Sequence, residues 1–216
     1  MASLHRSSSW LLRAYAVLFL ACAFVTALRA ESPDSAYFPM HVGDERVSKV
    51  VFLSPLGKVE NSTLTVTVKE TVEREGKTYY RGRIVMDGVY ARDYTKLMRK
   101  DDSGVYSIDE SKPDQKEVAD LLLPLKVGET QEVEVNGEKM KVAILGKEST
   151  AAGDKTYEDC YHIKLTPPSG TFEREMWLAP NVGAVKMVTS FVNGGKMSVM
   201  LEKYRAGGDD TAGGVK

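Results

Sequence analysis

A cysteine and a histidine stand two residues apart in the segment YEDCYHIKL, which runs from Tyr157 to Leu165. Strand alternation would put Cys160, His162 and Lys164 on one face, with the thiol and the imidazole about 7 Å apart. An imidazole can activate a thiol as a nucleophile. No third group that would orient the imidazole is recognisable, so we interpret Cys160 as a semi-buried structural cysteine beside a surface histidine. We therefore predict no catalytic residue, and a thiol-dependent enzyme using Cys160 ranks third among our hypotheses.

Acidic residues form the second group of side chains that could take part in catalysis or metal binding. They are Glu158-Asp159, Asp101-Asp102 and the alternating Glu173/Glu175. Paired carboxylates can act as general acid and base or collect Ca²⁺, but this spacing matches no calcium loop, and we interpret them as solvated strand faces or turns. Phosphate-binding glycine loops, His-Glu-x-x-His and Gly-x-Ser-x-Gly are absent from the sequence. We predict no enzyme activity, no metal and no cofactor.

The third group is a surplus of apolar side chains in the last predicted strands. In SVML, alternation places Val199 and Leu201 on one face and Met200 on the other. Strands that are apolar on both faces are either packed between layers or line a cavity. Core packing is one account, and a groove for a hydrophobic ligand is the other. The candidates for such a groove are Trp177, Met187, Met197 and Met200.

Alternating apolar and polar residues predict that β-strands position these side chains. TLTVTVK has period two, and Asn136-Gly137 in EVEVNGEKMKVAIL is typical of a tight hairpin turn. Further turns are predicted at Glu75-Gly76, Asp87-Gly88 and Asn193-Gly194-Gly195. We predict about ten antiparallel strands in a curved sheet, a sandwich or a half-barrel. The one short helix that we predict is DQKEVADLLL, which Pro124 ends.

The two halves of the chain share motifs in the same order. Pro-x-x-Val-Gly-acidic occurs twice, and the offsets are 85 residues from Gly43 to Gly128 and 79 from Gly104 to Gly183. We predict a β domain over 31–205 with repeat units at 37–110 and 122–205, followed by a disordered tail at 206–216. Chance matching of turn glycines is the alternative.

The stretch EMWLAPNVGAVKM fits a strand, a turn and a returning strand. The turn is Ala179-Pro180-Asn181, where a missing backbone amide does no harm, and Trp177 is predicted to pack in the core. A glycine at 183 would serve a backbone conformation that a side chain forbids. The residues to which we give structural roles are Pro124, Gly128, Cys160, Pro180 and Gly183.

The first thirty residues have the pattern of an export signal. A basic, acid-free start precedes an apolar run, and cleavage after Ala27 or Ala30 fits the preference for small residues. Lipid anchoring through Cys22 is the alternative, because FLAC loosely resembles a lipoprotein cleavage box. The mature chain would hold 26 basic and 30 acidic residues, which makes nucleic acid an unfavourable partner. We expect a periplasmic or secreted protein without a later transmembrane segment.

The second half of the chain resembles exported bacterial β-sheet proteins of unassigned function. Their pattern is Gly-Thr-aromatic-x-Asp-Cys-aromatic, then aromatic-x-Ala-Pro-x-Val-Gly-x-Val-Lys, with Pro-Leu-x-Val-Gly upstream. The matching residues are Thr156, Tyr157, Asp159, Cys160 and Tyr161, then Trp177, Ala179, Pro180, Val182, Gly183, Val185 and Lys186, with Pro124, Leu125, Val127 and Gly128 upstream. Lys155 stands where the pattern has glycine. The resemblance implies a curved antiparallel sheet, distantly like envelope lipoprotein-carrier folds, which hold acyl chains.

Together these observations favour a non-catalytic protein of the cell envelope that binds a lipid or another hydrophobic ligand. The alternative from another class is a structural module that binds an envelope protein through exposed strand edges.

Overall fold

The computed structural model describes residues 33–112, 116–135 and 138–208. The predicted export signal with Cys22, Ala27 and Ala30, the turn residues Asn136-Gly137 and most of the predicted tail lie outside the described residues.

Twelve strands form one antiparallel sheet in the described residues. They are β1 (Glu45–Leu53), β2 (Val59–Arg74), β3 (Lys77–Met86), β4 (Arg92–Asp101), β5 (Gly104–Asp109), β6 (Val118–Leu122), β7 (Thr130–Val135), β8 (Glu138–Ala152), β9 (Lys155–Thr166), β10 (Phe172–Ala179), β11 (Gly183–Phe191) and β12 (Lys196–Arg205). Two single-turn 3₁₀ helices, η1 (Pro33–Tyr37) and η2 (Gly88–Tyr90), complete the fold. The predicted all-β fold in a curved sheet is confirmed, and a two-sheet sandwich is not what forms.

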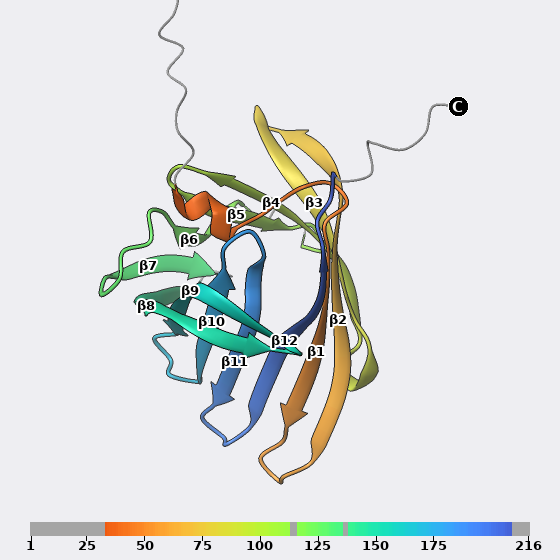
Figure 1. Cartoon of the computed structure of the whole chain (residues 1–216), viewed down its shortest axis with the longest axis vertical. Helices are drawn as coiled ribbons and strands as arrows, with labels where there is room; N and C mark the ends of the chain where they lie inside the picture. The colour runs from red at the N-terminus through yellow and green to blue at the C-terminus, as the bar shows by residue number, and fades with distance from the viewer. Residues whose placement is uncertain (1–32, 113–115, 136–137, 209–216) are drawn as a thin grey trace, which may run out of the picture. The chain divides into compact units, whose positions relative to one another are not determined.

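The sheet curls nearly into a barrel (Figure 1). Every strand pairs with its neighbour in sequence except β6 with β7, and β1 pairs with β12 across the chain. The two edge strands of the sheet, β6 and β7, are therefore consecutive in the chain. The side chain of Gln131 on β7 spans them, because its Oε1 accepts from the Leu122 amide at 2.6 Å and its Nε2 donates to the Leu122 carbonyl at 3.2 Å. A side-chain amide thus takes the place of a ladder of backbone hydrogen bonds.

One local prediction was wrong. The segment DQKEVADLLL contains the edge strand β6, which pairs with β5, in place of the predicted helix. The burial of Leu121, only 4% exposed, is a tertiary contact that outweighs the helical propensity of a short segment. After the turn at Asp87-Gly88, residues Gly88–Tyr90 form η2, and strand β4 begins at Arg92.

The concave face of the sheet is filled at one end by the main hydrophobic core. This packed end contains Tyr37, Met40, Val105, Leu121, Leu123, Leu125, Val133, Met140, Val142, Ile144, Tyr161, Ile163 and Leu178. Helix η1 adds the buried carboxylate of Asp34, which accepts hydrogen bonds from the Leu125 amide at 2.7 Å and the Tyr161 hydroxyl at 3.0 Å. These bonds fasten the start of the described chain to the packed end.

The turns before β1 and β7 have the same hydrogen-bond geometry. The Gly43 amide donates to the Val68 carbonyl, and the Gly128 amide donates to the Ile144 carbonyl. The reciprocal hydrogen bonds are also equivalent. The Val68 amide donates to the Asp44 carbonyl, and the Ile144 amide donates to the Glu129 carbonyl. Both glycines have positive φ, at 94° and 85°. The duplication of the whole unit stays a prediction, but these two turns are built alike.

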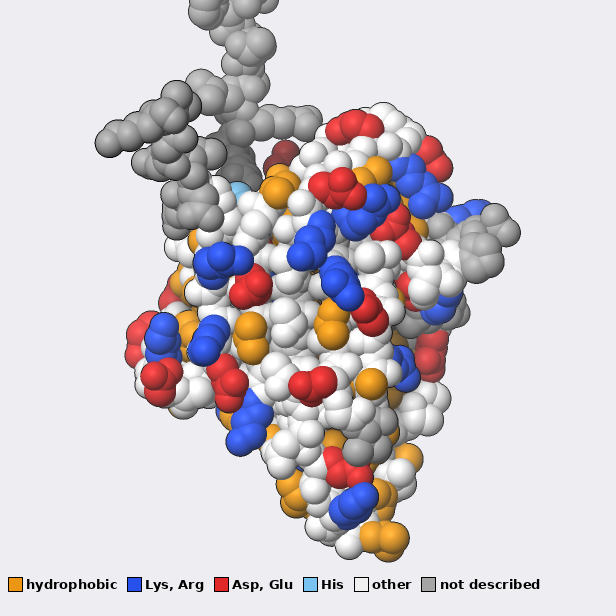
Figure 2. Space-filling view, turned by 90° about the vertical axis from the view of Figure 1, so that its right-hand side faces the viewer, with side chains coloured by type: hydrophobic (Ala, Val, Ile, Leu, Met, Phe, Trp, Pro, Cys, Tyr) orange, Lys and Arg blue, Asp and Glu red, His pale blue; other side chains and the backbone are white. Residues whose placement is uncertain are grey.

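The convex face that Figure 2 shows carries interspersed basic and acidic side chains. Pairs such as Arg81 of β3 with Glu110, which follows β5, at 2.9 Å and Arg83 of β3 with Asp93 of β4 at 2.6 Å contribute to this pattern. Within the part of the chain that the structure describes, no helix is long and apolar enough to cross a membrane.

Candidate functional site

The concave face is hollow at the end away from the packed core. A cavity of about 420 Å³ lies there between seven neighbouring strands, β10 to β12 and β1 to β4. Hydrophobic and aromatic side chains dominate its lining, and two arginines are the charged members among the described residues. The lining residues are Val50, Phe52, Leu64, Ile84, Met86, Tyr90, Arg92, Tyr94, Arg174, Met187, Phe191, Met197 and Val199.

Cross-strand pairing explains why these side chains share one face. Val50 stands opposite Val199, and Val199 stands opposite Met187. Directly paired residues point to the same side of a sheet, so the three side chains project into the same concavity. The hollow is therefore continuous across the β1–β12 pairing that joins the two halves of the chain.

The cavity ends at the hairpins between β1 and β2 and between β11 and β12, which lie at the bottom of Figure 1. Phe52 contacts Tyr90 and Phe191 there, with ring centroids 5.2 and 6.4 Å apart. The tips of the two hairpins expose Leu56 (96%) and Val192 (81%). Apolar side chains thus continue from the cavity lining out to the loops at its mouth.

Arg174 on β10 is the partly buried charge of the cavity. Its Nε donates to Oγ1 of the fully buried Thr189 at 3.1 Å, and its guanidinium lies 5.3 Å from the centre of the Phe172 ring. Among the described residues, no carboxylate forms an ion pair with it. Burial lowers the pKa of the Arg174 guanidinium from its ordinary value. The position was missed in the sequence, although alternation in FEREMW places Arg174 with Phe172 and Met176 and opposite both glutamates.

Two further polar groups lie on the opposite wall. Arg92 is exposed where β4 begins, and Tyr94 lies two residues further along the same strand. Burial raises the pKa of the Tyr94 phenol, so the phenol is neutral at physiological pH. The wall formed by β4 therefore offers a neutral hydroxyl inside and a cation at the rim.

The structure divides the four candidates for ligand contact into two pairs. Met187 and Met197 line the cavity, whereas Trp177 and Met200 do not. Trp177 neighbours Met176, which packs against the main core, and therefore projects from the other face of β10. Register puts Met200 opposite Lys186 and Lys186 opposite Trp177, so Met200 shares that other face.

Trp177 belongs to a second hydrophobic cluster with Ala152, Cys160, Ala179, Val185 and Leu201. Its indole stacks on His162 with centroids 4.3 Å apart, and its Nε1 donates to Glu148 at 2.6 Å. The predicted burial of Trp177 is confirmed, with 8% of the residue exposed.

Cys160 and His162 have separate partners. The Cys160 thiol is fully buried, donates to the Tyr157 carbonyl at 3.4 Å, and has its pKa raised to about 11 by burial and then by the nearby Asp159, Glu158 and Glu148 carboxylates. The His162 ring nitrogens face Glu148 at 3.2 Å and Glu175 at 2.7 Å. A raised pKa disfavours the thiolate, which is the nucleophilic form. The structural interpretation of Cys160 fits this geometry, although the cysteine is fully buried and not semi-buried as predicted.

The other residues with predicted structural roles lie at turns. Pro124 follows β6 and forms a cis peptide bond with Leu123. Gly128 precedes β7, and Pro180 lies between β10 and β11. Gly183 begins β11 with φ of 85°, and a Cβ added there would lie 3.4 Å from the Arg46 side chain. The prediction that Gly183 needs a backbone conformation unfavourable to other residues is confirmed.

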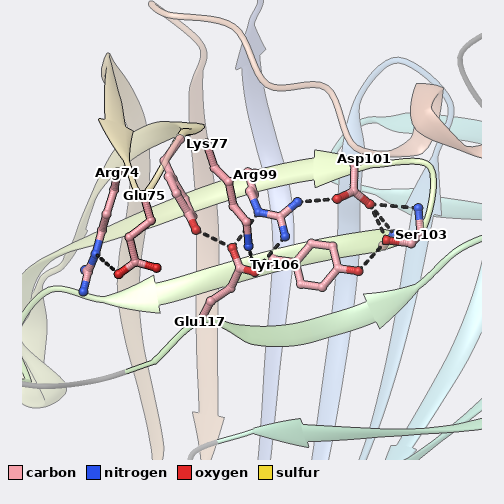
Figure 3. A network of polar contacts seen from close by, with 10 residues as sticks. Arg74, Glu75, Lys77, Arg99, Asp101, Ser103, Tyr106 and Glu117 are labelled. Atoms are coloured by element: carbon pink, nitrogen blue, oxygen red, sulfur yellow. Dashed lines mark hydrogen bonds and ion pairs between the residues drawn. The ribbon is translucent and has the colours of Figure 1, made fainter. Parts of the chain in front are cut away.

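A network of charges lies near the β6 edge of the sheet, on residues of β3, β4 and β5 and on Glu117 just before β6 (Figure 3). Arg99 donates to both oxygens of Glu117 and to Asp101, and its guanidinium lies 4.0 Å from the centre of the Tyr106 ring. The hydrogen bonds from Arg99, with those of Tyr79 and Lys77, hold the pKa of Glu117 at about 2 against the opposing effect of burial. Because the charges in this network neutralise each other, we interpret it as a structural clamp.

The sequence comparisons gave no match. No protein-family model matches the chain. No curated protein matches it either.

Solved structures of similar fold exist at low sequence identity. A protein from Bacteroides fragilis described as exported and as having a YmcC-like fold is 14% identical, with a TM-score of 0.48, over 78% of this chain and 98% of its own. A lipoprotein from Parabacteroides distasonis gives 13% identity and the same TM-score and coverage. A LolA superfamily protein from Nitrosomonas europaea is 11% identical, with a TM-score of 0.30, over 80% of this chain and 89% of its own. The similarity concerns the fold of these exported or lipoprotein chains.

Proposed function

We propose that this chain is a non-catalytic protein of the cell envelope that binds a hydrophobic ligand in the cavity between β10–β12 and β1–β4. The observation that carries the proposal is the cavity itself, about 420 Å³ in volume and lined mainly by apolar side chains. Pockets that hold small ligands commonly measure about 300–1,000 Å³ and have mostly apolar walls with a few polar groups. The export-type start of the sequence supports the cellular location.

The location of the cavity supports a binding role over a packing defect. Side chains of the neighbouring strands β5 to β10 fill the packed end, so the sheet closes its interior where it needs stability. At the hollow end, Met187 and Met197 supply flexible apolar surface that can adapt to a ligand. The strand edges, which the alternative interaction module would use, face each other and are bridged by Gln131.

A pair of matched substitutions on β12 tests the proposal. Met197→Trp adds volume inside the cavity, whereas Met200→Trp adds the same volume to a residue of the same strand that does not line it. Binding of Nile red, a neutral hydrophobic dye, would be followed by its fluorescence. We expect saturable binding to the wild type and to Met200→Trp, and binding weakened about tenfold or more in Met197→Trp.

Native mass spectrometry of protein purified from its own envelope gives an independent measurement. Release of a lipid-sized molecule on denaturation would support the proposal. Absence of saturable dye binding by the wild type, together with a bare chain in the spectrometer, would overturn it.

A further inference from the structure

A charged group in an apolar cavity needs a physical explanation. The aliphatic part of Arg174 lies among apolar residues, and within the described part of the chain its guanidinium has one hydrogen bond, to Thr189. A guanidinium carries five N–H donors in a fixed plane and stays protonated in proteins. Its burial in low-dielectric surroundings is unfavourable unless an anion or further acceptors compensate.

The nearest acidic residues in sequence do not supply that compensation. Glu173 pairs with Lys164 at 2.6 Å, and Glu175 pairs with His162 at 2.7 Å. Both carboxylates are on the face of β10 opposite to Arg174, because residues at odd and even positions of a strand point to opposite sides. The chain thus places two anions outside and one cation inside within three consecutive residues.

The contrast with Arg99 shows that this arrangement is specific to the cavity. Arg99 is also shielded from solvent, but it is held by Glu117 and Asp101. Among the described residues, Arg174 has a hydroxyl and an aromatic ring as its neighbours in place of carboxylates. An anion brought in by a ligand would complete the set of partners that Arg99 already has.

We propose that the cavity selects a single-chain amphiphile whose anionic head group, a carboxylate or a phosphate, pairs with Arg174 while its hydrocarbon chain contacts the apolar lining. This inference rests on the proposed function and specifies the ligand class for the same cavity. A guanidinium binds either head group through paired N–H donors, and such charge-assisted bonds are stronger than neutral ones. Arg92 at the rim adds a second cation on the opposite wall of the cavity.

The test compares three ligands of equal chain length: dodecanoate, dodecyl phosphate and dodecan-1-ol. Their affinities for the full chain would be measured by displacement of Nile red below the critical micelle concentrations. We expect at least one anionic ligand to bind on the order of tenfold more tightly than the alcohol, because a hydrogen bond to a charged group contributes that much. The ranking of the two anions then tells a fatty acid from a phosphorylated lipid.

Substitutions assign the preference to the residue. Arg174→Met keeps a side chain of similar length but removes the charge, so we expect the ratio of anion affinity to alcohol affinity to fall toward one. Arg174→Lys keeps the charge and is expected to retain most of the preference. Arg83→Met is the control for net charge, because Arg83 pairs with Asp93 and does not line the cavity.

The outcomes separate the two proposals. If the alcohol and both anions bind the wild type equally well, the inference on the head group is wrong while the hydrophobic cavity stands. If none of the three ligands binds, the proposed function fails as well. The wild-type comparison needs no variant, so a folding defect in Arg174→Met would not prevent the decision. A preference for the anion that persists in Arg174→Met would also overturn the role of this residue.

Discussion

The packed and hollow ends of the concave face are built mostly from different strands of one sheet, β5 to β10 at the packed end and β10 to β12 with β1 to β4 at the hollow end. At the packed end, Ile144 and Ile163 stand opposite each other with at most 1% exposed, and η1 adds Tyr37 and Asp34 to the core. At the hollow end, paired residues such as Phe52 and Met197 line a cavity of about 420 Å³. Both ends are apolar, so composition alone does not distinguish them.

The difference lies in what covers the sheet. At the packed end, η1 and the segment between β6 and β7 cross the concave face and place side chains in it. At the hollow end, the connections are the hairpins that join β1 to β2 and β11 to β12, and their exposed tips carry Leu56 and Val192. This comparison teaches that one curved sheet can separate stability from binding by packing one set of neighbouring strands and leaving another set around a hollow.

The largest expected effect comes from matched leucine truncations at the two ends. Leu178→Ala at the packed end, where the residue is 2% exposed, is expected to reduce the free energy of unfolding by about 2–5 kcal/mol. Leu64→Ala at the hollow end is expected to cost about 1 kcal/mol or less, because Leu64 already borders an open cavity. Urea unfolding followed by circular dichroism measures both. Equal losses would mean that the hollow end is packed like the other.

A smaller loss is expected when η1 is detached from the packed end. Asp34→Ala leaves the Leu125 amide without its buried acceptor and removes one hydrogen bond of the Tyr161 hydroxyl, which also contacts the Leu125 carbonyl at 3.3 Å, at a cost of about 1–3 kcal/mol. Ser35→Ala is the control in the same helix. If Asp34→Ala unfolds at the same urea concentration as Ser35→Ala, the carboxylate does not fasten η1 as we infer.

The pH dependence of stability isolates the Glu117 clamp. The pKa of Glu117 is about 2 in the folded chain, against an ordinary value of 4.5, chiefly because of its bonds with Arg99. A lowered folded-state pKa stabilises the fold fully above the unfolded-state value, and this stability is lost as pH falls from about 4.5 toward about 2. The difference in unfolding free energy between wild type and Glu117→Gln should therefore be largest near neutral pH and shrink over that window. A difference that does not change with pH would contradict the clamp.

The smallest effect is expected at Cys160. Its thiol is fully buried with a pKa of about 11, so a thiol-alkylating reagent at pH 8 should leave the native chain unlabelled and react after denaturation. Mass spectrometry of the intact chain reads the result. Rapid labelling of the native protein would reopen the hypothesis of a thiol-dependent enzyme.

Local sequence signals determined most of the strands and turns. Alternation in TLTVTVK and the glycine-containing turn at Glu75-Gly76 depend on neighbours close in sequence, and the turn shows the positive φ values of 53° and 72° that such turns need. Gly183 was identifiable for the same reason. The segment that became β6 was misjudged, because its strand exists only through pairing with β5 and burial of Leu121.

The cavity was only partly visible in the sequence. The sequence showed apolar residues on both faces of the last strands, but it did not show which face would be enclosed. The pairing of β1 with β12, far apart in the chain, decided that Met187 and Met197 face the hollow while Trp177 and Met200 do not.

Arg174 shows the same limit for a charged residue. Alternation fixed the face to which its side chain points, since this depends only on the backbone period of the strand. Whether that face would meet a carboxylate, water or an apolar wall depended on β1 to β4, which reach it through the curvature of the whole sheet. The sequence determined the strands and their two faces, and the tertiary structure decided which face encloses a cavity, because enclosure requires contacts between residues distant in the chain.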